Sequence, residues 1–513
     1  MVDNLKTISG DVDSKDNREV DVDVALDIAG LGWYNIRYSL CLALFLIAVI
    51  IEPVGYAYIL PSARCDLQMT ETQRGFIGSI PYIGIAITSF PWGYAVDTRG
   101  RKRMIVLSSL AAGFLGVLSA FMPDLISFTA LKFLMSLCLA CPAAVPYSFI
   151  GEILPGRYRD VTLSVTNAMQ IFGSVLVPLL GWAILPQNFS IDFGLYNFKP
   201  WRLLTIVYAL PFIIGALLMS LGPESPKYLM SCGRHDESLE VLRTMYAGNK
   251  RKSPDDFPVK RLKMITNNDE DKPTFFKSLV IQSAPLLKPP FIKWMVLIGF
   301  LLFGIFVNLN GLYIWLPDVL NTVLTGGGQS QTACEVLAQK RNQTVVGGVC
   351  VDTIDPMTFI INASSSLACA VIAVGVSSTV KIIGKKNLLI AVFILLGSVC
   401  LGINFATQKI LFAVLVSSFP ILGLSIGPVN AFAVEIFPTK LRGMAVSLAM
   451  MVGRFGSVVG MNVAGTLINS ACEVTFYSYG GLLYLCALLT LLLPRQKAPS
   501  VEEKESDYVS TKL

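Results

Sequence analysis

The sequence predicts an all-α membrane protein with 12 transmembrane helices in two pseudo-symmetric six-helix bundles. Of its 513 residues, 53% are hydrophobic and 15% are charged, and the mean hydropathy is +0.61. A soluble protein of this size needs a larger charged share to cover its surface. Apolar runs of about twenty residues recur along the chain, each long enough to cross roughly 30 Å of hydrocarbon as a helix. A ten-residue segment also appears twice.

The repeated segment is G-E-I-L-P-G-R-Y-R-D at 151–160, which returns as V-E-I-F-P-T-K-L-R-G at 434–443. Three landmarks recur at one constant offset: Glu152, Pro155 and Arg159 become Glu435, Pro438 and Arg442. Similarity over so long a distance is not the mark of a solenoid repeat. It indicates that the chain contains the same half-protein twice.

The spans divide evenly around a polar segment. The first six are expected at about 34–60, 75–95, 104–121, 125–149, 161–185 and 203–221, and the second six at about 294–316, 359–380, 387–405, 410–434, 444–468 and 477–493. The predicted domains are a cytosolic tail at 1–33, a first bundle at 34–222, a cytosolic linker with short helices at 223–293, a second bundle at 294–493 with an outer loop at 321–356, and a cytosolic tail at 494–513.

Lys and Arg in the short loops set the predicted orientation. The cations at 99–103, 157–159, 381–386 and 440–442 fall on the same side as the linker. An even number of spans then places both termini in the cytosol. The membrane is either the plasma membrane or that of an intracellular vesicle.

Two features of the predicted outer loops fit this orientation. Asn188 and Asn342 begin N-x-S/T sequons, which are acceptors for glycosylation. Cys334 and Cys350 lie in one outer loop that faces an oxidising compartment. They form either a disulfide with each other or two free thiols.

A loop motif between the second and third spans reads G-x-x-x-D-x-x-G-R-K-R and is carried by Gly93, Asp97, Gly100, Arg101, Lys102 and Arg103. A weaker copy, Gly384-Lys385-Lys386, follows the eighth span, with Lys381 in the place of the aspartate. With the duplication, this motif resembles the major facilitator superfamily over all twelve spans. The resemblance implies two six-helix bundles around one central cavity.

The same motif provides candidate gating residues. The glycines allow a tight turn and a close helix approach, while Asp97 and the basic cluster pair with nearby helix ends such as Glu152 and Arg159. Such pairs would latch the outward-open state; alternatively, the cations only set topology. The remaining gating candidates are Glu224, Glu435 and Arg442. Because the second copy lacks the aspartate, neutralising Glu152 is expected to disturb transport more than neutralising Glu435.

A narrower resemblance joins P-E-S-P-K-Y-L at 223–229 with W-A-I-L-P at 182–186 and Y-I-W-L-P-D at 313–318. This combination is similar to synaptic vesicle glycoprotein 2 and its relatives, with organic cation and anion carriers as close cousins. The chain departs from that family in its short first tail and in the small loop at 321–356, where the family carries a large luminal domain. The resemblance also implies a ligand-contacting role for Trp182.

Ionisable groups inside the membrane are costly unless they face a cavity or a partner. Glu52 lies just outward of the middle of the first span, and Arg454 lies near the middle of the eleventh. We hypothesise that both line the central cavity, with Arg454 attracting an anionic group and Glu52 a cation or a transported proton. The alternative is a structural ion pair or local packing. Lys132 in the fourth span either works in the cavity or snorkels to an interface.

Further candidate solute contacts combine amides with aromatic faces, a mixture that suits sugars or flat organic ions. They are Tyr82, Asn167, Gln170, Trp182, Phe306, Asn308, Asn310, Tyr313 and Trp315. The alternative for the aromatic residues is interfacial anchoring near helix ends.

These features predict a secondary transporter that moves an organic ion or a sugar-like solute by alternating access, driven by the solute gradient or by a coupled proton or sodium. Arg454 favours an ion over a neutral sugar. The alternative is a non-transporting membrane protein that acts in vesicle trafficking or partner binding. No nucleotide-binding loop, nucleophile motif or metal spacing occurs, so the sequence predicts no enzyme, no cofactor, no metal and no nucleic-acid partner. The final residues 510–513 match a PDZ ligand.

Overall fold

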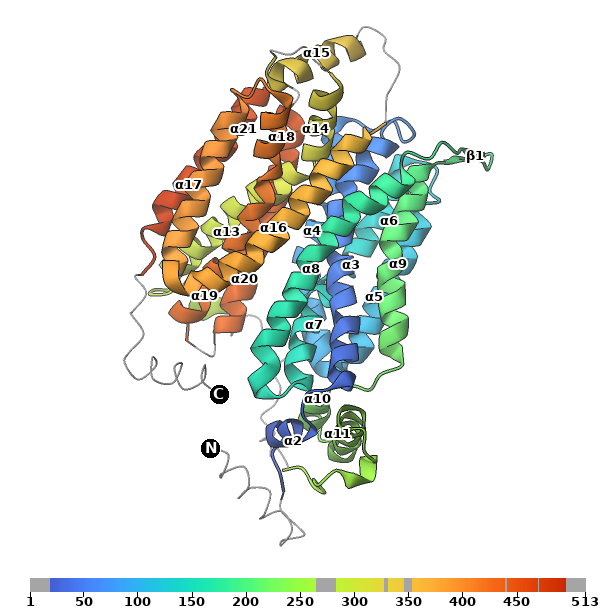
Figure 1. The fold of residues 1–513 in the computed structure, drawn as a ribbon, viewed down its shortest axis with the longest axis vertical. Helices are drawn as coiled ribbons and strands as arrows, with labels where there is room; N and C mark the ends of the chain where they lie inside the picture. The colour runs from blue at the N-terminus through green and yellow to red at the C-terminus, as the bar shows by residue number, and fades with distance from the viewer. Residues whose placement is uncertain are drawn as a thin grey trace.

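The computed structural model describes residues 19–263, 283–326, 331–345, 353–438, 441–468 and 470–494. Two groups of long helices lie side by side (Figure 1). The first half contains α3 (Trp33–Ala63), α4 (Glu71–Arg99), α5 (Arg101–Ser119), α6 (Leu125–Ser136), α7 (Ala140–Ile153), α8 (Gly156–Ile184) and α9 (Pro200–Ser220). The second contains α13 (Ile292–Tyr313), α14 (Leu316–Thr325), α16 (Pro356–Ile383), α17 (Lys385–Ile403), α18 (Lys409–Ser417), η4 (Phe419–Ser425), α19 (Ile426–Ile436), α20 (Arg442–Leu467) and α21 (Cys472–Thr490).

The prediction of twelve spans is confirmed. Among the described residues, 11 helical segments are long and apolar enough to cross a membrane, counting α6 with α7 and α18 with α19 as single broken spans. The twelfth expected span is α4, whose composition is more polar because it carries Ser79, Thr88 and Ser89. Helix α4 packs against α20 of the other half, so these side chains meet protein instead of lipid.

Local sequence explains where several helices begin. Thr70 and Gln73 form a capping box at the start of α4, and Asp124 accepts a hydrogen bond from the Ser127 amide at the start of α6. Gly100 and Gly384 precede α5 and α17 with φ values of 105° and 83°, which favour glycine. The same unusual backbone at equivalent positions shows the duplication in three dimensions.

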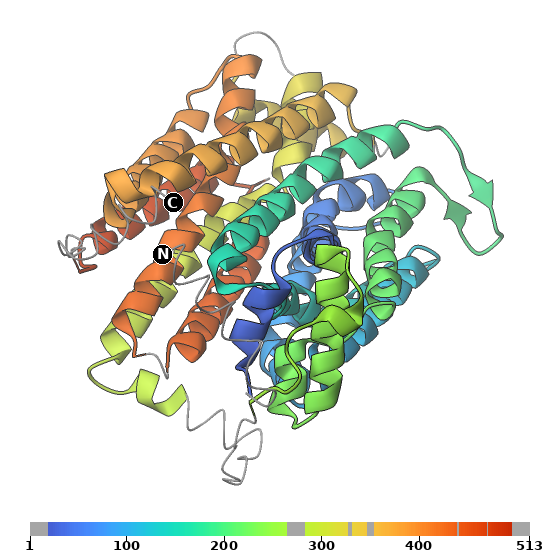
Figure 2. The same ribbon diagram turned by 60° about the horizontal axis from the view of Figure 1, so that its bottom comes forward.

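The molecule has two ends, called the linker end and the loop end. The linker end carries α2 (Val22–Ala29), α10 (Pro226–Ser231), α11 (His235–Lys250), η2 (Pro254–Asp256) and η3 (Ala284–Leu287). The loop end carries α15 (Ala333–Val345) and a hairpin of β1 (Ile191–Asp192) and β2 (Asn197–Phe198). The two halves diverge toward the linker end in both views (Figures 1 and 2). Their contacts are therefore concentrated toward the loop end.

The segment before the first span is helical in part. Val22, Leu26 and Ala29 of α2 are buried in a cluster that includes Leu242 and Met245 of α11. The Asn249 side-chain amide donates to the Gly30 carbonyl oxygen at 2.8 Å and also to the Asn35 side chain. The N-terminal segment is thus fastened to the linker of the same half.

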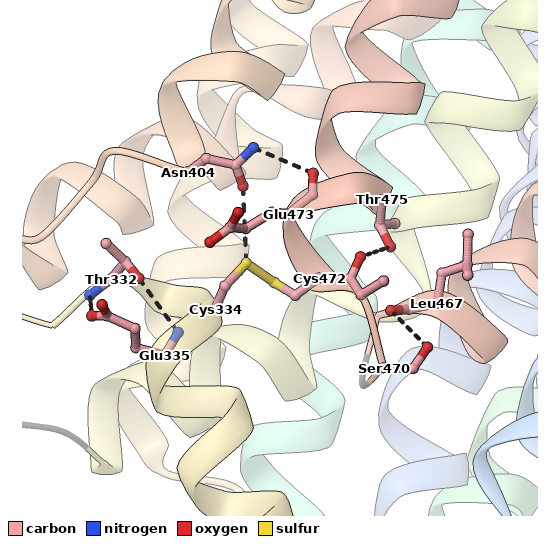
Figure 3. Close-up of a disulfide and its surroundings, with 10 residues drawn as sticks. Thr332, Cys334, Glu335, Asn404, Leu467, Ser470, Cys472, Glu473 and Thr475 are labelled. Atoms are coloured by element: carbon pink, nitrogen blue, oxygen red, sulfur yellow. Dashed lines mark hydrogen bonds between the residues drawn. A yellow bond between two sulfur atoms is a disulfide. The ribbon is translucent and has the colours of Figure 1, made fainter.

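The disulfide at the loop end differs from the predicted one. Cys334 of α15 is bonded to Cys472 at the start of α21, with 5.5 Å between their Cα atoms (Figure 3). The predicted Cys334–Cys350 pair is therefore wrong, because the fold places the start of α21 beside α15. Cys350 itself lies outside the described residues. Cys65, in the loop between α3 and α4, is also disulfide-bonded.

The two sequons lie in different settings. Asn188 is exposed in the coil that follows α8, as the prediction of a loop acceptor requires. Asn342 lies inside α15 instead of an open loop, and its side chain is outside the described part of the chain. Residues 510–513, with the predicted PDZ ligand, are also outside it.

Candidate functional site

Glu52 on α3 forms a buried ion pair within the first half. Its Oε1 atom accepts from the Lys132 Nζ atom of α6 at 2.7 Å, and both side chains are at most 1% exposed. The Lys132 ammonium also lies over the Tyr56 ring at 5.1 Å. The hypothesis that Glu52 and Arg454 both line one cavity stays a prediction, and in this conformation Lys132 of the same half neutralises the Glu52 carboxylate. This geometry is that of the structural ion pair considered as the alternative.

A group of tyrosines joins this pair to the other half. Tyr313 of α13 lies in the neighbourhood of Tyr82, Tyr58 and Tyr208 of the first half. Its hydroxyl is within hydrogen-bond reach of Ser366 on α16. The Tyr58 ring stacks on Phe359 of the second half at 5.5 Å between centroids. Two of the predicted solute contacts, Tyr82 and Tyr313, are therefore brought together at the junction of the halves.

Arg454 lies in the contact between α20 and α4. Its Nη1 atom donates to the Ser89 hydroxyl of the other half at 2.7 Å, and the side chain is partly exposed. No carboxylate of the described residues forms an ion pair with it. Asn310, another predicted contact, donates to the Ser457 hydroxyl at 2.9 Å, one helical turn along α20 from Arg454. The second half thus presents a cation and an amide on neighbouring helices.

A smaller polar group lies on α7 and α8. The Tyr147 hydroxyl donates to the Gln170 side-chain oxygen at 2.5 Å and lies 3.3 Å from that of Asn167. Asn167 is exposed and Gln170 is half-buried. Trp182, farther along α8, is 45% exposed. Sequence reasoning identified the two amides and Trp182 but not Tyr147, which orients the amides.

Three predicted solute contacts are inside the second half instead. Phe306 is 7% exposed and packs against Gly453, where an added Cβ would stand 2.9 Å from the ring. Asn308 is fully buried and donates to the Gly304 carbonyl oxygen of its own helix at 3.0 Å. Trp315 is 1% exposed, and its indole donates to the Met461 carbonyl oxygen at 3.3 Å. These residues cannot contact a solute in this conformation because protein atoms already cover them.

Trp315 belongs to a contact that closes the loop end between the halves. Arg74 of α4 is 1% exposed, its Nη1 atom lies 2.6 Å from the Asp318 carboxylate of α14, and its guanidinium stacks over Trp315 at 4.4 Å. The helices approach closely here because they carry glycine. A Cβ at Gly78 would stand 2.1 Å from Ile314, and one at Gly465 would stand 2.8 Å from Trp315.

Sequence reasoning missed this contact. The sequence indicated no role for Arg74, and Asp318 appeared only as the last residue of the segment Y-I-W-L-P-D. Two opposite charges, each at the boundary between a loop and a span and in different halves, were the available signal. Their separation of 244 residues hid it.

The predicted gating residues gather at the linker end of the first half. The Arg101 guanidinium lies 2.9 Å from the Glu152 carboxylate, which also accepts from the Ser225 hydroxyl. The Glu224 carboxylate accepts from the Lys102 amide at 2.9 Å and so stabilises the start of α5. Burial raises the pKa of Tyr228 to about 12, so the hydroxyl stays protonated and donates to the Thr98 carbonyl oxygen.

Other members of the motif depart from expectation. The Asp97 side chain is 72% exposed, and its carboxylate pairs with the Arg101 guanidinium of the same half at 3.6 Å. The Arg159 guanidinium lies 3.6 Å from the Asp23 carboxylate of α2. Gly93 has nothing within 4 Å of an added Cβ, so the expected close helix approach is absent there. Arg103 is exposed. Because Arg101 and Glu152 belong to one half, their ion pair braces that half and cannot latch the two halves together.

The second half carries the equivalent brace. Lys385, at the position equivalent to Arg101, forms an ion pair with Glu435, and the Arg442 guanidinium donates to the Phe437 carbonyl oxygen at 3.1 Å. Loss of the aspartate has therefore not removed the pair. The side chain of Glu435 is 45% exposed, against 15% for Glu152.

This difference in burial carries the predicted asymmetry. We expect Glu152→Gln to lower the free energy of unfolding by about 1–3 kcal/mol, because it replaces a charge-assisted hydrogen bond to Arg101 with a neutral one at a largely buried site. Glu435→Gln should cost less than about 1 kcal/mol, as is usual for a wetter pair. Thermal unfolding of the purified variants and their uptake of solute would measure both effects. Equal losses would contradict the asymmetry.

Two related helical halves that meet within the membrane are an architecture with an internal repeat, as found in many membrane transporter folds. The sequence model of the Major Facilitator Superfamily matches residues 39–338 and 346–511. The chain belongs to this superfamily, and it is an integral membrane protein. The prediction that the chain is not an enzyme agrees with this membership.

Among curated proteins, synaptic vesicle glycoprotein 2C of Mus musculus is 26% identical over 313 residues, which cover 57% of this chain and 43% of that protein. Synaptic vesicle glycoprotein 2A of Homo sapiens is 26% identical over 315 residues, covering 57% and 42%. The predicted resemblance to this family is confirmed. The match spans less than half the length of these relatives.

Solved structures share the fold. The inward-open xylose transporter XylE from E. coli has a TM-score of 0.65 at 18% identity, with 92% of this chain and 99% of that chain covered. The nucleoside transporter NupG has a TM-score of 0.61 at 10% identity, with 89% and 100% covered. At these identities the likeness shows the architecture alone.

Proposed function

We propose that this protein is a secondary transporter that moves a small organic anion across a membrane by alternating access. The observation that supports the proposal is Arg454, a cation inside the eleventh span with a neutral hydroxyl, that of Ser89, as its hydrogen-bond partner. A half-buried guanidinium inside a span costs free energy when it has no counter-ion, and an anionic solute would offset that cost on binding. Asn310 lies on the neighbouring helix and supplies a hydrogen-bond donor.

Alternating access requires that the halves separate at one end while they close at the other. Here the halves touch at the loop end and diverge toward the linker end (Figures 1 and 2). A solute would therefore reach Arg454 from the linker end in this conformation. Rocking toward the opposite state must break the Arg74–Asp318 ion pair and separate the Arg74 guanidinium from the Trp315 ring. The driving force is the solute gradient or a coupled proton or sodium.

Binding and uptake by purified protein in liposomes test the proposal. We expect small carboxylates or sulfonates, but not matched neutral sugars or organic cations, to raise the melting temperature and to be taken up. Arg454→Met should weaken anion binding at least tenfold, and Arg454→Lys less. The ligand-free Arg454→Met variant should melt no lower than the parent protein, because it removes the desolvation cost of the guanidinium.

Lys252→Met is the matched control for the loss of one positive charge, because Lys252 is exposed on the linker far from the spans. Unchanged anion binding in Arg454→Met would contradict the role of Arg454. Binding of sugars alone would favour the sugar-like alternative. Silence toward all three solute classes would favour the non-transporting scaffold. Uptake under imposed proton or sodium gradients would identify the coupled ion.

A further inference from the structure

The hairpin between α8 and α9 leaves three large apolar side chains uncovered. Ile191 is 54% exposed, Phe193 58% and Leu195 84%. The strands pair Ile191 with Phe198 and Asp192 with Asn197, and Gly194 supplies the turn with a φ of 79°. Asp192 is the one charged residue between 189 and 198, and its carboxylate accepts from the Gly194 amide at 2.7 Å. The tip of the hairpin is therefore apolar and its charge is used within the turn.

The base of the hairpin is fixed to the helical bundle. Phe198 lies 6.0 Å from Phe121 at the end of α5 and 6.3 Å from Phe189, measured between ring centroids. The Arg202 guanidinium stacks over Tyr196 at 4.6 Å, and Asp66 holds that guanidinium at 3.1 Å. Aromatic and charged contacts thus set the direction in which the hairpin points.

The hairpin points to the side of the helical bundle. The hairpin extends beyond the outline of the bundle at the level where the first-half helices end, in both views (Figures 1 and 2). Ile126 at the start of α6 is 82% exposed, and Phe121 at the end of α5 is 37% exposed. The uncovered side chains of the hairpin therefore continue the apolar surface that the first half turns toward lipid.

We propose that residues 189–198 form a membrane-surface anchor, with Ile191, Phe193 and Leu195 inserted at the boundary between headgroups and acyl chains at the loop end. Segments that lie at this boundary are rich in aromatic side chains and carry few charges on the inserted face. A protein strand is a poor fit as the partner, because two paired residues offer little edge for backbone hydrogen bonds. Insertion into lipid requires no exposed strand edge.

The anchor is an addition to one half. The equivalent connection in the second half, residues 468–471 between α20 and α21, is too short to hold a hairpin. The duplicated fold therefore does not require residues 189–198 for its own packing. An anchor on one side fixes the first half to the bilayer surface while the second half moves.

Spin-label accessibility in lipid nanodiscs tests this proposal on the full-length protein. One nitroxide is attached at Leu195→Cys and, in a second sample, at Phe193→Cys, both with Cys232→Ser because Cys232 is exposed. The signal of the Cys232→Ser parent is subtracted. We expect both labels to collide with molecular oxygen at least threefold more than with a water-soluble nickel chelate.

Gln187→Cys is the matched control, since Gln187 is exposed in the same loop and lies outside residues 189–198. It should show the reverse preference, for the nickel chelate. Equal access of the nickel chelate to residues 187, 193 and 195 would overturn the proposal, and would also be the result if a protein partner normally covers the tip. Unchanged melting temperatures of the labelled variants would show that the fold is intact. The outcome does not depend on whether the protein transports a solute.

Discussion

Asp318→Asn should open the loop end between the two halves. The change removes the carboxylate that lies 2.6 Å from the Arg74 guanidinium, which is 1% exposed, and leaves it with Glu71 of its own half, at 3.5 Å. Removing one member of a fully buried ion pair costs 3–5 kcal/mol, and Asp318 is a quarter exposed, so we expect about 2 kcal/mol against the closed state. Because about 1.4 kcal/mol is a factor of ten, the loop-end-open population should rise more than tenfold.

Pulsed electron resonance would measure the opening directly. Spin labels at Gln68→Cys of the first half and Thr466→Cys of the second are both on exposed positions at the loop end. The distance between them should lengthen in Asp318→Asn and in Arg74→Gln. The double variant should cost less than the sum of the single variants, because the two charges are coupled.

Lys199→Met is the matched control for this experiment. Lys199 pairs with Asp66 at 2.9 Å at the same end of the molecule, but both belong to the first half. Its loss should leave the distance between the labels unchanged. An equal shift in Lys199→Met, or no shift in Asp318→Asn, would show that the Arg74–Asp318 pair does not hold the halves together.

Lys132→Met should lower the melting temperature more than any other single charge removal discussed here. It leaves Glu52 uncompensated at 1% exposure, a situation that costs about 3–5 kcal/mol. The double variant Glu52→Gln with Lys132→Met should recover most of this loss, because no buried charge remains. Lys199→Met is the control: Lys199 pairs with Asp66 at 31% exposure and should cost less than about 1 kcal/mol.

Thermal unfolding of the three variants in detergent tests this expectation. A Lys132→Met variant as stable as the parent would show that the pair contributes no net stability. The double variant also separates structure from coupling. If it folds but its uptake no longer responds to a proton gradient, Glu52 would regain the proton-carrying role predicted from the sequence.

The duplicated segment shows how far sequence reasoning extends. Its constant offset predicted two related halves, and the matching backbone at Gly100 and Gly384 is the same duplication in three dimensions. The offset also pointed to Glu152 and Glu435 as equivalent positions, and each forms an ion pair with a basic residue of the loop motif that precedes it in the chain, Arg101 or Lys385. It did not predict that these pairs lie within a half, because a linear pattern says which ends are equivalent but not which half supplies the partner.

Phe306, Asn308 and Trp315 show what could not be predicted from the sequence. Each is of a residue type that binds solutes, and each lies near the polar part of the seventh span. Helical spacing alone does not decide which way these side chains point, because the facing helix sets that direction. Helix α20, whose glycines let it approach α13 closely, covers Phe306 and Trp315, while Asn308 is buried and bonded to Gly304 of its own helix.

The amino-acid sequence by itself determined that this chain spans a membrane twelve times as two related halves, because hydropathy and internal repetition are properties of the linear chain. It also identified Arg454 and Glu52 as costly charges. Only the tertiary structure decided their partners, Ser89 for one and Lys132 for the other. The physical reason is that ion pairs, the Cys334–Cys472 disulfide and the closure at Arg74 and Asp318 join segments far apart in the chain. Packing of the helices brings those segments together.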